Sequence, residues 1–174
     1  GRGLLTPENR DEYLQRIDHE IAVFEKDLKR MRFIYNALRF STVEQVQEFA
    51  PELVINCVTL SYTVEAFKEV IPYLPQGCIL SDIASVKTGL MEFYEGCGFR
   101  YVSVHPMFGP TFANLGNLQP ENAIIINEPQ QKGSDGSVLV KGTDYMGMIF
   151  YRDLFASLKL NVREYTFHGH DEVV

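Results

Sequence analysis

The stretch CILSDIASVKTGLMEFYEGCGFRYVSV, residues 78–104, contains one complete strand–helix–strand unit. Its two ends, residues 78–83 and 101–104, are short apolar runs without alternation, which predicts strands that are buried on both faces. Between them, residues 87–94 have the spacing of a helix, and Gly96 ends that helix. Strands of this kind are typical of a parallel sheet covered by helices.

The same alternation of strand and helix extends outward through most of the chain. Further apolar runs predict strands at residues 21–24, 53–58 and 123–126. Helical patterns occupy residues 27–38, 41–50, 64–71 and 145–158. Strands that recur about every 20–25 residues with helices between them predict βαβ units. We therefore expect an α/β fold, a Rossmann-like doubly wound parallel sheet with flanking helices.

We expect residues 1–174 to form a single Rossmann-like domain with two atypical segments. Residues 1–18 contain no predicted strand and form a divergent N-terminal segment. Residues 129–143, PQQKGSDGSVLVKGT, are polar and rich in glycine, which predicts a surface loop or a hairpin insertion.

The composition excludes several classes of protein. The chain has 16 Lys and Arg against 23 Asp and Glu, a net charge of −7 with no basic stripe, which argues against nucleic acid as a partner. No run approaches about 18 apolar residues and no basic leader precedes an apolar one, so we expect neither a membrane span nor a secretory signal. The three cysteines have no CxxC spacing, so we expect reduced thiols in a cytoplasmic protein and no metal site. Cys57 and Cys78 lie in apolar runs, which predicts that both are buried.

Two motifs at predicted strand ends contain reactive side chains: DIASVK at 82–87 and HPMFGPT at 105–111. Ligands of open parallel sheets bind outside the carboxyl ends of the strands, which makes Ser85, Lys87 and His105 candidates. Each has two interpretations at this point. Ser85 binds a ligand or caps a helix. Lys87 attracts an anionic substrate or is solvated, and His105 reacts or pairs with a backbone carbonyl.

Glu25 is a candidate ligand for a dinucleotide. It follows the predicted strand 21–24, where dinucleotide-binding units have the acidic residue that binds the ribose hydroxyls. Gly1 and Gly3 precede it at a suitable distance, but Thr6 stands where a third glycine is expected. Glu25 is thus either a ribose ligand, which favours NAD over NADP by repelling a 2′-phosphate, or a solvated strand end.

With these motifs the sequence resembles the prephenate dehydrogenase family over roughly residues 19–128 and 144–174. The resemblance rests on SDIASVK at 81–87, followed by VHPMFGPT at 104–111. It implies an NAD-dependent oxidoreductase of tyrosine biosynthesis that converts prephenate to 4-hydroxyphenylpyruvate and carbon dioxide. By this resemblance His105 and Ser85 are the catalytic pair: the imidazole accepts the proton of the substrate hydroxyl, and the serine orients the imidazole and contacts the substrate.

The resemblance also implies where the ligands lie. Lys87 joins the catalytic pair in the substrate site, and NAD is lined by Glu25, Thr59, Ala84, Ser85 and Pro106. The family begins with a strand and a Gly-rich turn and continues, after the pair His170-Asp171, into a helical dimerisation domain. The sequence shows neither feature, so we expect weak or no activity for this chain alone. For the complete enzyme, the resemblance implies a homodimer. Two alternatives stay open, an arogenate dehydrogenase and a non-catalytic binding or regulatory module.

Overall fold

A computed structural model describes residues 19–34, 37–109, 118 and 121–174. By its internal contacts the chain divides into two compact units, residues 1–46 and 47–174, and each is described here by itself. The glycines expected near the N-terminus and the end of the HPMFGPT motif, Pro110 and Thr111, lie outside the described residues.

The first unit contains two short parallel strands, β1 (Ala22–Phe24) and β2 (Leu38–Phe40). The prediction of a helix over residues 27–38 is wrong, because the described residues of this range form only one short helix, the 3₁₀ helix η1 (Arg30–Phe33). The backbone N–H of Leu38 donates to the carbonyl of Ile21 over 2.8 Å, so pairing between strands overrides the local helical pattern. The helix α2 (Val43–Phe49) follows, as predicted.

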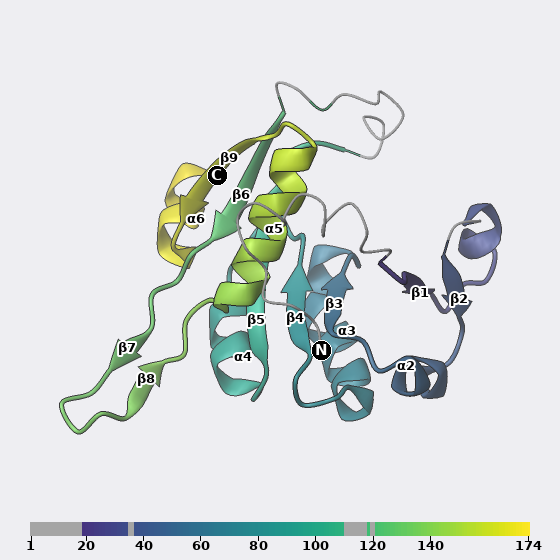
Figure 1. Cartoon of the computed structure of the whole chain (residues 1–174), viewed down its shortest axis with the longest axis horizontal. Coiled ribbons are helices and arrows are strands. Elements are labelled where there is room, and N and C mark those ends of the chain that lie inside the picture. The colour runs from purple at the N-terminus through teal and green to yellow at the C-terminus, as the bar shows by residue number, and fades with distance from the viewer. Residues whose placement is uncertain (1–18, 35–36, 110–117, 119–120) are drawn as a thin grey trace, which may run out of the picture. The chain divides into compact units, whose positions relative to one another are not determined.

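The second unit is built on a five-stranded sheet in the order β3-β4-β5-β6-β9 (Figure 1). Its strands are β3 (Leu53–Asn56), β4 (Ile79–Asp82), β5 (Arg100–Pro106), β6 (Asn122–Ile126) and β9 (Asn161–Tyr165). Strands β3, β4 and β5 are parallel, whereas β6 runs antiparallel to β5 and β9 runs parallel to β6. The predicted α/β class is confirmed, with a mixed rather than purely parallel sheet.

Helices cover both faces of this sheet (Figure 1). They are α3 (Thr63–Val70), α4 (Leu90–Gly96), α5 (Tyr145–Ser157) and α6 (Phe167–Val173), with the 3₁₀ turns η2 (Leu60–Tyr62) and η3 (Ile71–Tyr73) around α3. On one face, Val102 and Val104 of β5 pack in a cluster with side chains of α5. On the other face, Tyr101 stacks on Tyr94 of α4 at 4.5 Å between ring centroids. None of the described helices is long and apolar enough to cross a membrane.

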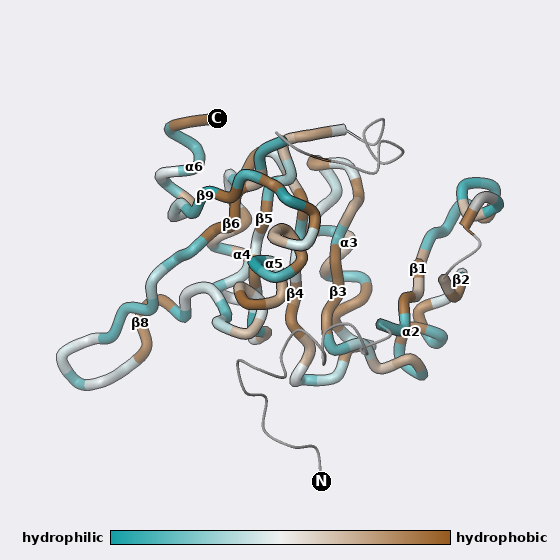
Figure 2. The backbone as a smooth tube through the Cα atoms, turned by 45° about the horizontal axis from the view of Figure 1, so that its top comes forward, coloured by the Kyte–Doolittle hydropathy of each residue, from teal (hydrophilic) through white to brown (hydrophobic). Residues whose placement is uncertain are grey.

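Hydrophobic residues colour most of β3 in Figure 2, but this edge strand is only partly buried, with Ile55 42% exposed, so the predicted burial of both faces is wrong for it. The close approach of α5 to the sheet depends on Gly147. A Cβ atom at that position would lie 2.7 Å from Cγ1 of Val102, closer than van der Waals contact allows. This glycine therefore sets the distance between α5 and β5.

The segment 129–143 contains an antiparallel hairpin, β7 (Gln131–Lys132) and β8 (Val138–Val140), which extends away from the sheet (Figure 1). Its tip is exposed, but its base is bonded to the rest of the unit. The Glu95 carboxylate accepts hydrogen bonds from the backbone N–H of Lys141 and, at 3.1 Å, of Gly142. The hydroxyl of Thr143 donates to the carbonyl of Ile126 over 2.8 Å.

Candidate functional site

Two polar residues end β3 and β4 and turn the chain toward the carboxyl edge of the sheet. Asn56 and Asp82 are paired in the register of these strands. Each side chain accepts a hydrogen bond from the backbone N–H two residues further on, at 3.1 Å and 2.9 Å. These turns bring Thr59 and Ser85 to the edge as exposed residues and Ala84 as a half-buried one. All three of these predicted cofactor-binding residues thus lie at the edge where open sheets bind ligands.

Lys87 does not lie on that open edge. Its side chain is fully buried, with Nζ 2.7 Å from Oδ2 of Asp82 and 2.8 Å from the carbonyl oxygen of Val104. The hydroxyl of Tyr94 donates to the other oxygen of Asp82 over 2.6 Å. Burial lowers the pKa of Lys87, and the attraction of Asp82 opposes that shift. The structure thus corrects both expectations for Lys87, since the ammonium is neither solvated nor free to attract a substrate.

Ser85 does not cap a helix. Helix α4 begins at Leu90, three residues later than the pattern predicts, because Gly89 before it has a left-handed backbone with φ 78°. Among the described residues, no hydrogen bond joins Ser85 to His105. The imidazole of His105 bonds to another histidine instead. The hydroxyl of Ser85 is exposed at the carboxyl edge.

His105 lies within β5, opposite Ile124 of β6, and is 8% exposed. Its Nδ1 lies 3.0 Å from Nε2 of His170, a fully buried residue of α6. The Nδ1 of His170 in turn lies 3.1 Å from a carboxylate oxygen of Asp171. Burial, with His170 and Lys87 nearby, lowers the pKa of His105 to about 4, so its imidazole is neutral at pH 7. A buried neutral imidazole at a strand end can act as a base.

The helix that holds His170 is fixed by its first turn. Thr166 caps α6 by accepting a hydrogen bond from the backbone N–H of Gly169 over 3.1 Å. The Glu128 carboxylate accepts from the N–H of Phe167 over 3.0 Å, and the Phe167 ring packs beside Tyr101. The local sequence pattern predicts no role for His170 and neither β9 nor α6. The one signal for it was the adjacent pair His170-Asp171, whose partner His105 is 65 residues away.

Glu25 belongs to the first unit. It follows β1 directly, is half-buried, and its Oε1 accepts a hydrogen bond from the N–H of Asp27 over 2.9 Å. This is the position that the ribose ligand has in dinucleotide-binding units. Pro106, the last predicted cofactor residue, ends β5 and is half-buried.

The segments that follow β3, β4 and β5 also expose apolar side chains. These are Val58, Ile83, Val86 and Met107. Together with the exposed hydroxyls of Thr59 and Ser85, they form an edge that is apolar with a few polar groups. Such a composition is typical of sites that bind small organic ligands.

The cysteines contribute no thiolate to this edge. Cys78 is buried, as predicted, and burial raises its pKa to about 11. Cys57 is exposed, so the prediction of its burial is wrong: β3 ends at Asn56, one residue before it. Burial of its sulfur by neighbouring groups still raises its pKa.

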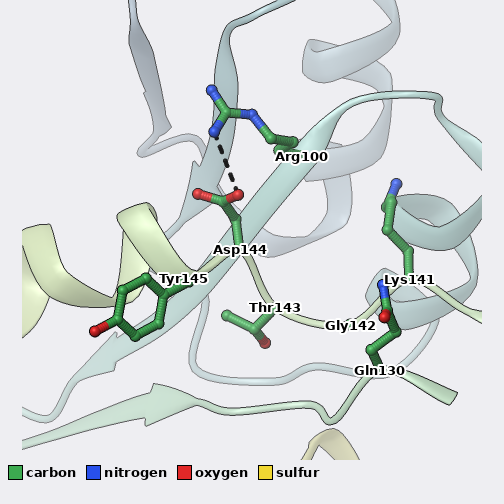
Figure 3. A pocket seen from close by; sticks show the side chains of 7 residues that line it. All are labelled: Arg100, Gln130, Lys141, Gly142, Thr143, Asp144 and Tyr145. Atoms are coloured by element: carbon green, nitrogen blue, oxygen red, sulfur yellow. Dashed lines mark hydrogen bonds and ion pairs between the residues drawn. The ribbon is translucent and has the colours of Figure 1, made fainter.

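A cavity of about 370 Å³ lies elsewhere in the second unit, between the start of α5 and the base of the hairpin (Figure 3). Its lining includes Arg100, at the opposite end of β5 from His105. Both of its cations are already engaged. Arg100 pairs with Asp144 at 3.4 Å, and Nζ of Lys141 donates to the carbonyls of Tyr94 and Phe99. This cavity therefore contributes nothing to the chemistry at the carboxyl edge.

Comparison with known proteins gives a family match over most of the chain. Residues 5–133 match the family model of the prephenate dehydrogenase nucleotide-binding domain. A curated protein of Methanocaldococcus jannaschii, named "Probable arogenate/prephenate dehydrogenase", is 30% identical over 125 residues. That match includes 69% of this chain and 27% of the relative, so the chain spans about a quarter of that relative's length.

Solved structures have the same fold. Prephenate dehydrogenase from Aquifex aeolicus, in complex with hydroxyphenyl propionate and NAD⁺, aligns with a TM-score of 0.71 and 18% identity. The alignment covers 92% of this chain and 56% of that one. Arogenate dehydrogenase from Synechocystis aligns with a TM-score of 0.65, 18% identity and the same coverage.

Proposed function

Because this chain belongs to the prephenate dehydrogenase family through its nucleotide-binding domain, we propose that it binds NAD and supplies the base for the oxidative decarboxylation of prephenate. The observation that carries the proposal is His105, a neutral buried imidazole at the carboxyl edge of the sheet, within the HPMFGPT motif. A general base must be unprotonated at the working pH, and its pKa satisfies that condition.

The proposed reaction breaks two bonds of the substrate. The ring carbon that bears the hydroxyl loses its hydrogen as hydride, and the bond to the ring carboxylate breaks to release carbon dioxide. The chemistry that NAD supplies when bound is acceptance of the hydride. His105 takes the hydroxyl proton as the hydride leaves and returns it to the oxygen of the aromatic product. Because aromatisation drives the reaction, the protein mainly has to position the substrate and handle one proton.

The residues at the strand ends fit NAD. Glu25 follows β1 with a half-buried carboxylate, which is the group that binds ribose hydroxyls in such folds. The exposed edge of the second unit offers hydroxyls at Thr59 and Ser85, and Ala84 and Pro106 are half-buried beside apolar side chains. We propose that these residues line the cofactor and that Ser85 also contacts the substrate. Lys87 then acts through Asp82, by holding the turn that presents Ala84 and Ser85.

Calorimetric titration of the chain with NAD and with NADP tests the cofactor assignment. We expect NAD to bind more tightly, because the Glu25 carboxylate repels a 2′-phosphate. Glu25→Gln keeps the acceptor for the Asp27 N–H, removes the charge, and should weaken NAD binding by about 10–100-fold, as for a hydrogen bond to a charged group. Equal binding of NAD and NADP by the unaltered chain would refute the role of Glu25. No binding of either would favour a non-catalytic module.

NADH formation from prephenate or from arogenate by the complete enzyme built around this sequence tests the substrate. Arogenate, the amino-acid analogue of prephenate, is the alternative, because the Synechocystis relative is named for it. We expect prephenate to be the better substrate, and His105→Asn to lower turnover by about 10²–10⁴-fold with little change in NAD affinity. His168→Asn is the control, since His168 is exposed on the same helix as His170. We further propose, from the family resemblance alone, that the enzyme is a cytoplasmic homodimer.

A further inference from the structure

The two buried histidines define a chain of hydrogen bonds that ends on a carboxylate. Asp171 contacts Nδ1 of His170, and Nε2 of His170 contacts Nδ1 of His105. The three groups come from β5 and α6, and both imidazoles are largely buried. The hydrogen-bonding capacity of each group fixes where the protons lie.

An ionised carboxylate can only accept hydrogen bonds, so Nδ1 of His170 carries the proton that it donates to Asp171. A neutral imidazole has one N–H, and Nε2 of His170 is then an acceptor. Its 3.0 Å contact with His105 therefore requires a proton on Nδ1 of His105. Nε2 of His105 is left with the lone pair.

We propose that His170, oriented by Asp171, is a positioning residue that holds His105 in the tautomer with a free Nε2. This inference rests on the proposed function, in which His105 is the base. It also assigns the proton-accepting atom, because Nδ1 is already occupied by His170. Ser85 and the substrate hydroxyl can reach the imidazole only through Nε2.

The arrangement also keeps the hydrogen bond to His105 intact when that imidazole takes a proton. When Nε2 takes the substrate proton, the imidazolium keeps donating from Nδ1 to His170, whose own N–H points to the Asp171 carboxylate. His170 and Lys87 both lower the pKa of His105, so the chain of hydrogen bonds fixes the orientation of the imidazole rather than its charge. The other charged groups near His105 are Lys87, which opposes protonation, and Asp82, which favours it.

The tautomer can be measured directly in the 174-residue chain by long-range ¹H–¹⁵N correlation NMR of the imidazoles at pH 7. Protonated and unprotonated ring nitrogens resonate at well-separated ¹⁵N shifts. We expect His105 to show a protonated Nδ1 and an unprotonated Nε2. The opposite tautomer in the unaltered chain would overturn the proposal, whatever the activity.

Asp171→Asn is the informative variant, because its amide can donate to Nδ1 of His170 and so reverse both tautomers. Asp171 is 40% exposed, so this change leaves the core intact, which circular dichroism verifies. We expect the ¹⁵N shifts of His105 to move toward the Nε2-protonated form, and kcat of the complete enzyme to fall by about 10²–10⁴-fold with KM little changed. His168→Asn, on the exposed face of α6, should leave both unchanged.

The two proposals fail in distinguishable ways. Unaltered His105 shifts in Asp171→Asn would contradict the role of His170 and Asp171 even if NAD-dependent turnover is present. The predicted tautomer without turnover on prephenate or arogenate by the complete enzyme would instead contradict the proposed function and leave the hydrogen-bonded chain intact.

Discussion

Replacing Lys87 with methionine should destabilise the second unit by about 3–5 kcal/mol, the cost of leaving a buried charge without its partner. Methionine has a similar length but no ammonium. Asp82 would keep its bonds from Tyr94 and from the N–H of Ala84, but it would lose its counter-charge. The carbonyl of Val104 would also lose a donor. Both charged side chains are 0% exposed, so water cannot replace the missing ammonium without opening the core.

Urea unfolding followed by far-ultraviolet circular dichroism at pH 7 measures this change by linear extrapolation. Lys68→Met is the matched control: Lys68 is exposed on α3, so its replacement should change the free energy of unfolding by less than about 0.5 kcal/mol. The double variant Lys87→Met with Asp82→Asn should recover about 0.5–3 kcal/mol relative to the sum of the single changes, because the two residues are in contact. If Lys87→Met lowers the free energy of unfolding by less than about 1 kcal/mol, the buried ion pair is refuted and Lys87 is a solvated residue.

Three further changes test the packing around the site. Gly147→Ala should lower stability by about 1–3 kcal/mol, because the added Cβ would clash with Val102. Alanine itself favours helices, so a variant that thermal melting shows to be stabilised would contradict the contact. Shortening the hairpin tip, residues 133–137, should lower the free energy of unfolding by less than about 1 kcal/mol. Thr143→Val at the base of the hairpin should lower it by about 1–3 kcal/mol, because two hydrogen bonds are lost. Similar urea unfolding curves for the two variants would refute this distinction. Because the pKa of His105 is about 4 in the fold and near 6.5 unfolded, the unfolded chain binds more protons in that window. Stability should therefore fall as the pH drops from about 6.5 to about 4, by at most about 1.4 kcal/mol per pH unit, and His105→Asn should reduce that slope.

Local pattern was sufficient for much of the secondary structure. The apolar runs around Ile79 and Ile125 became strands, and the pattern at residues 145–158 became α5. Such runs are buried on both faces in any α/β sheet, so their prediction does not depend on the details of topology. The helix expected at residues 27–38 failed because its last residue, Leu38, pairs with β1, a contact that helix propensity does not describe.

For the candidate site, the sequence located the strand ends but not the contacts made there. It identified Ser85 and His105 as candidates because polar residues follow buried strands, and the structure has both at the carboxyl edge. It could not predict that Lys87 turns inward to Asp82, since a lysine near a helix start is equally compatible with water. It also missed β9 and α6, which bring His170 to His105.

By itself, the sequence determined the α/β class, the presence of buried strands and the family, because these depend on periodicity and on motifs within a few residues of one another. Only the tertiary structure decided the direction of β6, the burial of Lys87 and the partner of His105. The AIII run of β6 is apolar on both faces and so contains no information on direction. Lys87 meets the Val104 carbonyl across 17 residues and His170 meets His105 across 65, and such pairings arise from packing of the whole unit rather than from local preference.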